Sequence, residues 1–341
     1  MNSPMRAVII GCGTGGQGRA GRHSIAYAHA LSMKRSGGLV QLTAAATRTP
    51  RNAEAFAREF PGTTMYSDYR EMLTAEAPDF VSVCAFPPER GEMVMAAIAA
   101  GAKIILAEKP FALNTASAHR MLDAAESAGA RIFVNFQRRY GAPFAAASDA
   151  IHSGMIGRLS SVNVVHPGTG FINFGPHLLD TAAGWLAPRN PVRAFAAIQW
   201  SDSEKYQGVG IEKQLLGTVH FDDGTRLIVE SGEHTPSLCT ILRADGDQGF
   251  VELVLSPEEG DIGTLRGFSA TSGAIKCPVA DENFHHGTIE TNLYFDRLFM
   301  DILTHHQAGN PSRVDAKIAL QGIEILEKWS ISAKENRIVG W

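Results

Sequence analysis

The first 136 residues alternate short apolar runs with segments of helical periodicity, and this alternation restricts the fold more than any other feature of the chain. Short apolar runs between helical segments are typical of strands that are buried in a parallel sheet and connected by helices. The predicted strands cover residues 7–10, 40–46, 63–66, 80–85, 103–107 and 131–136. The predicted helices cover residues 24–35, 52–59, 69–75, 91–100 and 115–128. We therefore predict a doubly wound parallel α/β sheet over residues 1–136.

A glycine-rich segment follows the first predicted strand directly. Gly11, Gly13, Thr14, Gly15 and Gly16 give this turn the spacing G-x-G-x-x-G. Glycines allow a tight turn whose backbone approaches a pyrophosphate, while the N–H groups of the following helix point toward it. Glycine-rich turns are common, but this one stands at the first strand of an alternating pattern. These five residues therefore predict a dinucleotide-binding site on a Rossmann domain.

The end of the second predicted strand indicates which nicotinamide cofactor is preferred. Thr47, Arg48 and Arg51 follow this strand, and the first acidic residue is Glu54. A site for NAD usually carries an acid here for the ribose hydroxyls, whereas a guanidinium group binds a 2′-phosphate with two hydrogen bonds. We therefore expect NADP to be preferred, with NAD as the alternative cofactor. In the simpler interpretation, the two arginines only decorate the start of the helix at 52–59.

The strand predicted at 103–107 leads into Glu108, Lys109 and Pro110. Proline disfavours the α conformation at Lys109 and removes a backbone donor, so the chain turns here. In an open α/β sheet, ligands bind beyond the carboxyl ends of the strands. Lys109 is therefore a candidate catalytic residue, and the simpler interpretation is a solvated surface lysine.

Another strand end carries Phe86, Pro87 and Pro88, after the strand predicted at 80–85. We interpret these residues as a turn that could line the nicotinamide side of the same site. The alternative is a rigid turn without any ligand contact.

From residue 158 the pattern changes to strands with few helices between them. The predicted strands cover residues 159–165, 192–200, 214–221, 226–231, 238–243 and 250–255, and helical periodicity returns at 284–306 and 315–333. Asp222, Asp223 and Gly224 indicate a hairpin between two of the strands. Residues 137–341 are therefore predicted to form an α+β domain with a large, mostly antiparallel open sheet. Its last helix, at about 315–333, is free to pack back on the first domain.

One predicted helix within this second half begins at Pro176 and carries His177 in its first turn. Proline suits the first helical position, and a histidine near a helix N-terminus tends to stay neutral. Asp180 lies on the same face, so His177 is either an acid or base, or a structural histidine paired with Asp180. A metal site that adds His285 or His286 completes no recognised ligand spacing, so we expect no metal.

The composition narrows the class of protein further. The chain is 45% hydrophobic, has a net charge of −4 and a pI of about 6.3, and shows no Lys/Arg cluster, which argues against nucleic acid as a partner. No apolar run approaches the roughly 18–20 residues that span a bilayer, and no signal-peptide segment precedes the first strand. We therefore expect no membrane partner. The four cysteines form no C-x-x-C pair, as expected for reduced thiols in a cytoplasmic protein without structural zinc.

Several of these segments together resemble the glucose-fructose oxidoreductase / inositol dehydrogenase / MocA family (Gfo/Idh/MocA), and the resemblance covers nearly the whole chain. Its most specific segment is Glu108-Lys109-Pro110. The other segments are the glycine turn and residues 84–88, 135–140, 153–159, 170–180 and 310–315. The resemblance implies an N-terminal Rossmann domain and a C-terminal sheet domain that often mediates association, so we expect a homodimer or homotetramer.

The resemblance also implies an activity and a site. The activity is NAD(P)-dependent hydride transfer between nicotinamide and a secondary alcohol or ketone of a sugar, a cyclitol or a sugar derivative. Lys109 would hold or protonate the reacting oxygen, His177 would act as acid or base, and the Lys109–Pro110 bond is often cis in relatives. Besides the glycine turn and the residues Thr47, Arg48 and Arg51 after the second strand, the expected cofactor contacts are Ala85, Phe86, Pro87, Glu108, Lys109 and Gln137. The substrate contacts expected are Asn173, Arg138, Tyr140 and Phe171.

The sequence departs from the family at Asn173, where many sugar and inositol dehydrogenases carry an aspartate four residues before the histidine. An amide can orient a hydroxyl but cannot accept a proton, so the expected relay is reduced to Lys109 and His177. Two alternatives within the same family stay open. One is a glycosidase-like enzyme that regenerates its bound NAD, and the other is a catalytically silent NAD(P)-binding regulator.

Overall fold

The computed structural model of the chain describes residues 3–13, 25–206, 209–235, 237–255, 263–276, 293–310 and 312–341, without the side chains of residues 172, 173, 206 and 293. The chain divides into two compact units. One unit contains Met1–Gln137 and Gly287–Leu320, and the other contains Arg138–His286 and Gln321–Trp341. None of the helices within the described ranges is long and apolar enough to cross a membrane.

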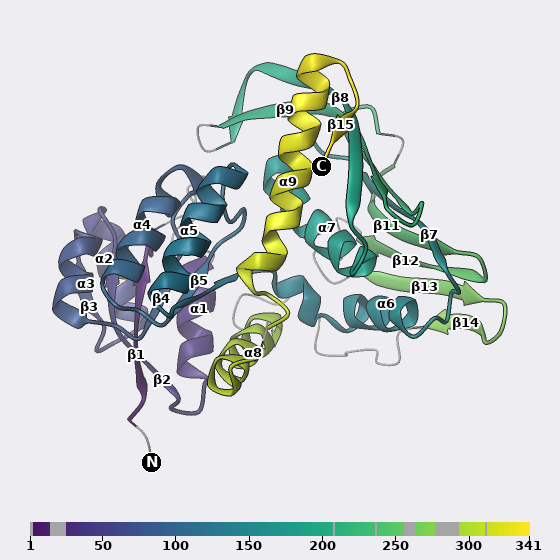
Figure 1. The fold of residues 1–341 in the computed structure, drawn as a ribbon. Coiled ribbons are helices and arrows are strands. Elements are labelled where there is room, and N and C mark those ends of the chain that lie inside the picture. Colours follow the sequence, from purple (N-terminus) through teal and green to yellow (C-terminus); the bar gives the residue numbers. More distant parts are fainter. Residues whose placement is uncertain are drawn as a thin grey trace. The chain divides into compact units, whose positions relative to one another are not determined.

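The first unit is built on a parallel sheet with the strand order β3-β2-β1-β4-β5-β6. Its strands are β1 (Met5–Ile10), β2 (Val40–Ala46), β3 (Thr64–Tyr66), β4 (Phe80–Val83), β5 (Ile104–Ala107) and β6 (Arg131–Val134). Its first five helices are α1 (Ile25–Lys34), α2 (Pro50–Glu59), α3 (Tyr69–Glu76), α4 (Pro87–Ala99) and α5 (Thr115–Ser127). Helices lie on both faces of the sheet (Figure 1), and β4 and β5 are accordingly buried along their whole length. The predicted doubly wound α/β domain is confirmed.

Helix α4 begins at Pro87, so the prediction of a free turn over Phe86, Pro87 and Pro88 before a helix at 91–100 is wrong. Pro87 occupies the first helical position, where its missing N–H has no partner to lose and its fixed φ suits a helix. Phe86 is the N-cap residue, with an extended backbone of φ −70° and ψ 155°. The carboxyl end of β4 therefore leads almost directly into a helix N-terminus.

The chain returns to the first unit through α8 (Leu293–Ala308) and the start of α9 (Ala316–Glu335). The Ser32 hydroxyl of α1 donates to Asp296 of α8 at 2.7 Å. Phe299 of α8 packs against Phe80 of β4, with 5.1 Å between the ring centroids. The helices predicted at 284–306 and 315–333 are confirmed where they are described, and residues 284–292 lie outside the described ranges.

The second unit is built on a nine-stranded sheet with the order β14-β13-β12-β11-β7-β10-β9-β8-β15. Every neighbouring pair is antiparallel except β7 with β10, which confirms the predicted mostly antiparallel sheet. Its strands are β7 (Leu159–His166), β8 (Pro191–Tyr206), β9 (Val209–Phe221), β10 (Arg226–Gly232), β11 (Thr240–Gly246), β12 (Gly249–Leu255), β13 (Thr264–Ser269), β14 (Gly273–Lys276) and β15 (Val339–Gly340). The last three strands were not predicted, because they are short or rich in glycine and polar residues.

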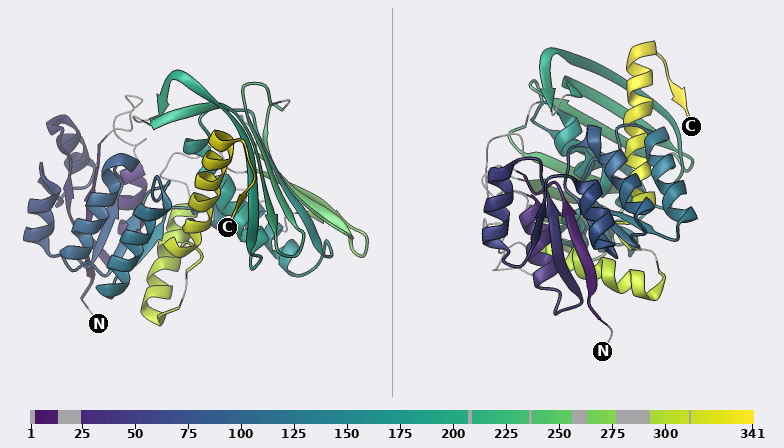
Figure 2. Two further views of the ribbon diagram at one scale, coloured as in Figure 1. Left: turned by 45° about the horizontal axis from the view of Figure 1, so that its top comes forward. Right: turned by 90° about the vertical axis from the view of Figure 1, so that its left-hand side faces the viewer.

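Helices α6 (Ala142–His152) and α7 (Phe171–Leu186) and the second part of α9 pack on one face of this sheet (Figures 1 and 2). Trp329 of α9 lies in this core, and its indole Nε1 donates to the carbonyl oxygen of Thr218 at 3.0 Å. Some residues of the opposite parity on the strands are exposed and apolar, among them Phe195, Leu216 and Phe268. The helices therefore cover one face of the sheet and leave these side chains on the other.

Helix α7 begins at Phe171, so the prediction that Pro176 starts the helix and places His177 in the first turn is wrong. Gly170 precedes the helix with a left-handed backbone of φ 69°, which glycine adopts without strain. Pro176 lies inside the helix and lacks the N–H that would bond to the carbonyl one turn earlier. His177 therefore stands in the second turn, away from the helix N-terminus.

Candidate active site

The turn after β1 lies close to the end of β4, which is the neighbouring strand in the sheet. Gly11 has φ +92°, and a Cβ built on it would lie 2.9 Å from the Ala85 nitrogen and 3.1 Å from the Cys84 carbonyl carbon. Its own N–H donates to the carbonyl oxygen of Ala46 at 2.9 Å. The backbone therefore needs glycine here for both its conformation and its close packing. This places Gly11 and Ala85, two expected cofactor contacts, side by side.

The same turn also lies against the end of β2. A Cβ built on Gly13 would lie 3.1 Å from the Asn52 Nδ2 atom and 3.6 Å from the Thr47 hydroxyl. Gly13 and Thr47 are thus brought together, as a shared cofactor site requires. The other expected residues of the turn, Thr14, Gly15 and Gly16, lie outside the described residues.

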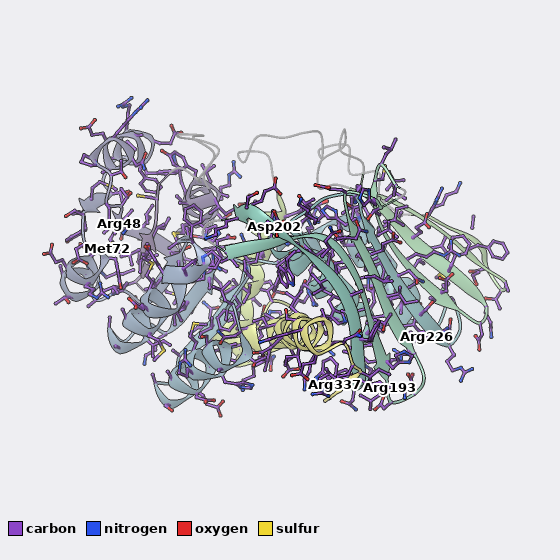
Figure 3. All side chains as sticks on the ribbon, turned by 90° about the horizontal axis from the view of Figure 1, so that it is seen from above. Arg48, Met72, Arg193, Asp202, Arg226 and Arg337 are labelled. Carbon is purple, nitrogen blue, oxygen red and sulfur yellow. The ribbon has the colours of Figure 1, made fainter. Side chains whose placement is uncertain are left out.

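Both arginines after β2 are exposed. Arg48 (labelled in Figure 3) forms an ion pair with Glu89 of α4, with 3.2 Å between Nη2 and Oε2. Arg51 lies in the first turn of α2. Their guanidinium groups are therefore accessible to a phosphate, although Glu89 already competes for Arg48.

Lys109 follows the carboxyl end of β5 and is half-buried. Its peptide bond to Pro110 is cis. Its backbone N–H donates to Glu108 Oε2 at 3.3 Å. This strand end belongs to the same edge of the sheet as the glycine turn, since all six strands are parallel.

Arg90 of α4 connects two loops at this edge. Its Nε and Nη2 atoms donate to the carbonyl oxygen of Ala85 at 3.1 and 2.7 Å, and Nη1 donates to the carbonyl oxygen of Pro110. The side chain is buried, so these charge-assisted bonds are shielded from water. Arg90 was not among the predicted site residues, since nothing in the sequence of its helix indicates that it reaches back to two carbonyls.

Glu108 was expected to contact the cofactor, and the structure gives its carboxylate buried protein partners. Asn135 Nδ2, after β6, donates to Glu108 Oε1 at 2.6 Å. His29 Nε2, from α1, lies 3.2 Å from the same oxygen and 3.2 Å from Asn135 Nδ2. All three side chains are buried. His29 was missed by the sequence analysis, because its partners lie far along the chain and α1 carries no local signature for them.

The other ring nitrogen of His29 faces β4. Nδ1 is hydrogen-bonded to Ser82 Oγ and lies 3.7 Å from Cys84 Sγ. Burial lowers the pKa of His29, but Cys84 and Glu108 outweigh it and raise this pKa to about 10. Burial raises the pKa of Glu108, and the bonds from His29 and Asn135 outweigh it and lower this pKa. Both shifts favour the ion pair of imidazolium and carboxylate.

The remaining expected cofactor contacts lie at the starts of two helical segments. Phe86 is exposed at the N-cap of α4, and Pro87 follows it. Gln137 is buried at the start of the short 3-10 helix η1 (Gln137–Tyr140).

In the second unit, Arg138 packs on α7 through a stack of planar groups. Its guanidinium lies over the ring of Phe174, with 4.2 Å from Cζ to the centroid. His166 of β7 stacks on Phe174 at 4.7 Å, with an angle of 4° between the planes. Burial and the neighbouring Arg138 lower the pKa of His166 to about 4, so its imidazole is neutral at pH 7. Neither His166 nor Phe174 was among the predicted site residues.

Four expected site residues of this unit are buried, and Arg138 is one of them. Phe171 belongs to the hydrophobic core, and Tyr140 and His177 are buried as well. The side chain of Asn173 lies outside the described residues.

Asp180 is bonded to Arg139, which corrects the alternative that paired it with His177. Arg139 Nε donates to Asp180 Oδ2 at 2.6 Å, and Nη2 donates to Oδ1 at 2.8 Å. Within the described residues, no group of three or more His, Cys, Asp or Glu side chains could hold a metal ion.

Residues 5–136 match the family model described as an oxidoreductase family with an NAD-binding Rossmann fold, GFO_IDH_MocA. The chain is 24% identical to a D-glucoside 3-dehydrogenase of Escherichia coli (strain K12) over 265 residues, which cover 67% of this chain and 70% of that protein. It is 34% identical to an inositol 2-dehydrogenase of Pseudomonas syringae pv. syringae (strain B728a) over 106 residues, which cover 31% of each protein.

Among solved structures, an NAD-binding oxidoreductase from Klebsiella pneumoniae has the same fold. It superposes with a TM-score of 0.80 at 18% sequence identity and covers 99% of each chain. The family match extends over the strands, the glycine turn and the Glu108-Lys109-Pro110 segment of the first unit. The N-terminal part of this chain, residues 5–136, is therefore an NAD(P)-binding Rossmann domain of the Gfo/Idh/MocA oxidoreductase family.

Proposed function

We propose that this protein is an NAD(P)-dependent dehydrogenase or ketoreductase that acts on a secondary alcohol or ketone of a sugar, a cyclitol or a sugar derivative. The observation that carries this proposal is a half-buried lysine, Lys109, at the same sheet edge as the glycine turn of a Rossmann domain. The names of the related glucoside and inositol dehydrogenases support the substrate class. The bound nicotinamide would supply the hydride chemistry.

The cofactor would lie along the carboxyl edge of the parallel sheet. Gly11 leaves no room for a side chain against the Ala85 backbone, and a Cβ on Gly13 would crowd the Asn52 side chain. A turn without side chains suits the close approach of a pyrophosphate. Ala85, Phe86 and Pro87 follow β4, and Lys109 follows β5, so they would line the nicotinamide side. Thr14, Gly15, Gly16, Glu108 and Gln137 complete the proposed cofactor contacts.

Lys109 and His177 would handle the proton. In the oxidation direction, one of them removes the hydroxyl proton, and in reduction the same group returns it to the forming alkoxide. The proposed substrate contacts are Asn173, Arg138, Tyr140 and Phe171.

The test of this function is turnover with a panel of polyols. Purified protein is mixed with NADP⁺ or NAD⁺ and with glucosides, inositols and free sugars, and absorbance is followed near 340 nm. We expect turnover with at least one of them, and Lys109→Ala should lower kcat by about 10²- to 10⁴-fold. The matched control is Lys103→Ala, an exposed lysine just before the same strand, which should leave kcat unchanged.

Two outcomes would contradict the proposal. A Lys109→Ala variant with wild-type kcat would refute the role of Lys109. Cofactor binding without turnover on any substrate would favour a catalytically silent regulator. Release of an aglycone without net reduction of added cofactor would instead favour the glycosidase-like alternative.

We further propose that NADP is preferred over NAD. Arg48 and Arg51 are exposed after β2, where the 2′-phosphate would lie. Arg48→Ala should therefore weaken NADP⁺ binding by about tenfold or more and leave NAD⁺ binding nearly unchanged. Arg58→Ala, an exposed arginine at the other end of α2, is the control. Equal loss of both cofactors in Arg48→Ala would refute the preference.

The open face of the second sheet supports a homodimer or homotetramer. Phe195 and Leu216 are exposed on the paired strands β8 and β9, and Phe268 is exposed on β13 of the same sheet. Exposed apolar side chains that lie together mark association surfaces. Phe195→Asp should lower the mass measured by light scattering on a sizing column. A monomeric wild-type protein would refute this part of the proposal.

A further inference from the structure

A buried histidine, His29, is connected to the proposed catalytic lysine through Glu108. His29 of α1 lies 3.2 Å from Glu108, and the other carboxylate oxygen of Glu108 accepts the backbone N–H of Lys109 at 3.3 Å. Lys109 also acts on Glu108 through its charge. Glu108 is therefore shared between an imidazole on one side and the lysine on the other.

The geometry and the raised pKa of His29 together place a proton on Nε2. Glu108 Oε1 is an acceptor, and it already receives a hydrogen bond from Asn135 at 2.6 Å. An unprotonated Nε2 would turn a lone pair toward this oxygen at 3.2 Å, which is repulsive in a buried site. Asn135 Nδ2 also lies 3.2 Å from Nε2, but the pKa of about 10 keeps the imidazole protonated at pH 7, so Nε2 donates to Glu108. A buried carboxylate requires such a partner, because an unpaired charge is costly to bury.

Among the described residues, the other groups that face His29 come from β4, from the end of β6 and from α8. Ser82 and Cys84 of β4 face Nδ1, and Asn135 follows β6. Helix α8 contributes the ring of Phe295, whose centroid lies 6.2 Å from that of His29. The neighbouring acid of α8, Asp296, is bonded to Ser32 and Arg35. Glu108 is thus the carboxylate bonded to His29, and the imidazolium can balance its charge.

We propose that His29 is a positioning residue for Lys109. His29 bonds to the Glu108 carboxylate and balances its charge. As a result, Glu108 holds the Lys109 backbone in place but does not bind the Lys109 amine strongly. This inference rests on the proposed function only where it concerns turnover. The charges of His29 and Glu108 act on the Lys109 amine whichever reaction Lys109 serves.

The inference predicts opposite effects for two variants that each keep a hydrogen-bonding side chain. His29→Asn removes the positive charge, so Glu108 attracts the Lys109 ammonium more strongly and the amine becomes neutral at a higher pH. Glu108→Gln removes the negative charge, so the Lys109 amine becomes neutral at a lower pH. We expect each shift to be roughly one pH unit, in opposite directions.

The experiment measures the ionisation of the amine directly. The full-length protein and both variants are labelled with trace acetic anhydride at a series of pH values, and acetylation of Lys109 is quantified by mass spectrometry. Lys103 in the same chain is the internal reference, because it is exposed and its labelling should not move. Ser32→Ala is the control variant, since it removes a hydrogen bond from the same helix one turn away from His29.

Opposite shifts of the Lys109 labelling midpoint, with Ser32→Ala unshifted, would establish the inference. Midpoints that shift in the same direction, or in neither variant, would overturn the inference. If His29 only supported the fold, the two variants would not move the Lys109 midpoint in opposite directions. The double variant, His29→Asn with Glu108→Gln, should fall between the two and covers the case in which one single variant folds poorly.

The pH profile of kcat/KM separates this inference from the proposed function. If Lys109 is the acid or base, the profile should shift with the labelling midpoint in each variant. If the labelling shifts and the profile does not, the catalytic role of Lys109 fails and the positioning by His29 stands.

Discussion

Arg139 and Asp180 form a bidentate ion pair between η1 and α7. Two side-chain bonds of 2.6 and 2.8 Å join them, and Arg139 Nη2 also donates to the Asp180 carbonyl oxygen at 2.8 Å. Asp180 is buried, and the Arg139 side chain is largely covered. Because Arg138 and Tyr140 flank Arg139, this pair fixes the segment that carries two of the proposed substrate contacts.

Arg139→Ala should therefore destabilise the second unit strongly. Removing one partner of a buried pair leaves an unpaired charge, which typically costs about 3–5 kcal/mol. Urea unfolding monitored by fluorescence measures the loss. Arg158→Ala is the control, because its pair with Asp247 is exposed and 3.9 Å long, and it should change the free energy of unfolding by about 0.5 kcal/mol or less. Equal losses of unfolding free energy in the two variants would contradict a stabilising role of the Arg139–Asp180 pair.

Gly217→Ala tests the packing of α9 on the sheet. A Cβ at this position of β9 would lie 2.5 Å from Cε2 and 2.7 Å from Cζ2 of Trp329, which is fully buried. The indole cannot move freely, since its nitrogen is bonded to Thr218, so we expect a loss of about 1–3 kcal/mol in unfolding free energy. Gly210→Ala in the same strand has nothing within 4 Å of its Cβ and should be nearly neutral. A stable Gly217→Ala would show that α9 is loosely packed.

Gly11→Ala tests the close approach of the glycine turn to the end of β4. Alanine would meet both an unfavourable φ of +92° and the Ala85 nitrogen at 2.9 Å. Gly38→Ala is the matched control, because it has φ +84° with open space around its Cβ and should cost only about 1 kcal/mol of strain. Gly11→Ala should lower the melting temperature more than Gly38→Ala does. It should also weaken NAD(P)⁺ binding, as measured by calorimetry. Unchanged cofactor affinity would place the cofactor elsewhere.

The pH dependence of stability follows from the raised pKa of His29. Since the folded-state pKa of about 10 lies above the ordinary value of 6.5, the stabilisation is fully present below pH 6.5 and is lost as the pH rises through about 10. His29→Asn lacks this contribution. The difference in melting temperature between wild type and variant should therefore be largest at pH 6–6.5 and shrink toward pH 10. A constant difference across this range would show that His29 does not titrate on unfolding.

Local patterns predicted much of the first unit. The apolar runs at 40–46 and 103–107 correspond closely to β2 and β5, because strands buried on both faces must be apolar along their length. The prolines misled the prediction twice. Pro87 starts a helix that was expected to begin later, whereas Pro176 lies inside a helix that was expected to begin with it. Proline fixes φ at about −65°, a value that fits the first turn of a helix and also its interior when one hydrogen bond is lost, so the surrounding packing decided between the two positions.

In the candidate site, too, local features could be predicted and long-range contacts could not. Gly11 and Lys109 could be singled out from the sequence, since a glycine turn and a charged residue at a buried strand end are local features. The partners of Glu108 could not. His29 and Asn135 come from elements far along the chain, and Asp180 pairs with Arg139 rather than with His177 on its own helix.

Local sequence patterns were enough to predict the order and type of most elements and the edge of the sheet at which a cofactor site would lie. Which charges meet in the interior could be read only from the folded chain. Hydrophobic periodicity is a local property that each segment carries with it, whereas the pairing of buried polar groups depends on which distant elements pack together. Lys109 was therefore visible as a candidate from the outset, but the histidine that stands behind its neighbouring carboxylate was not.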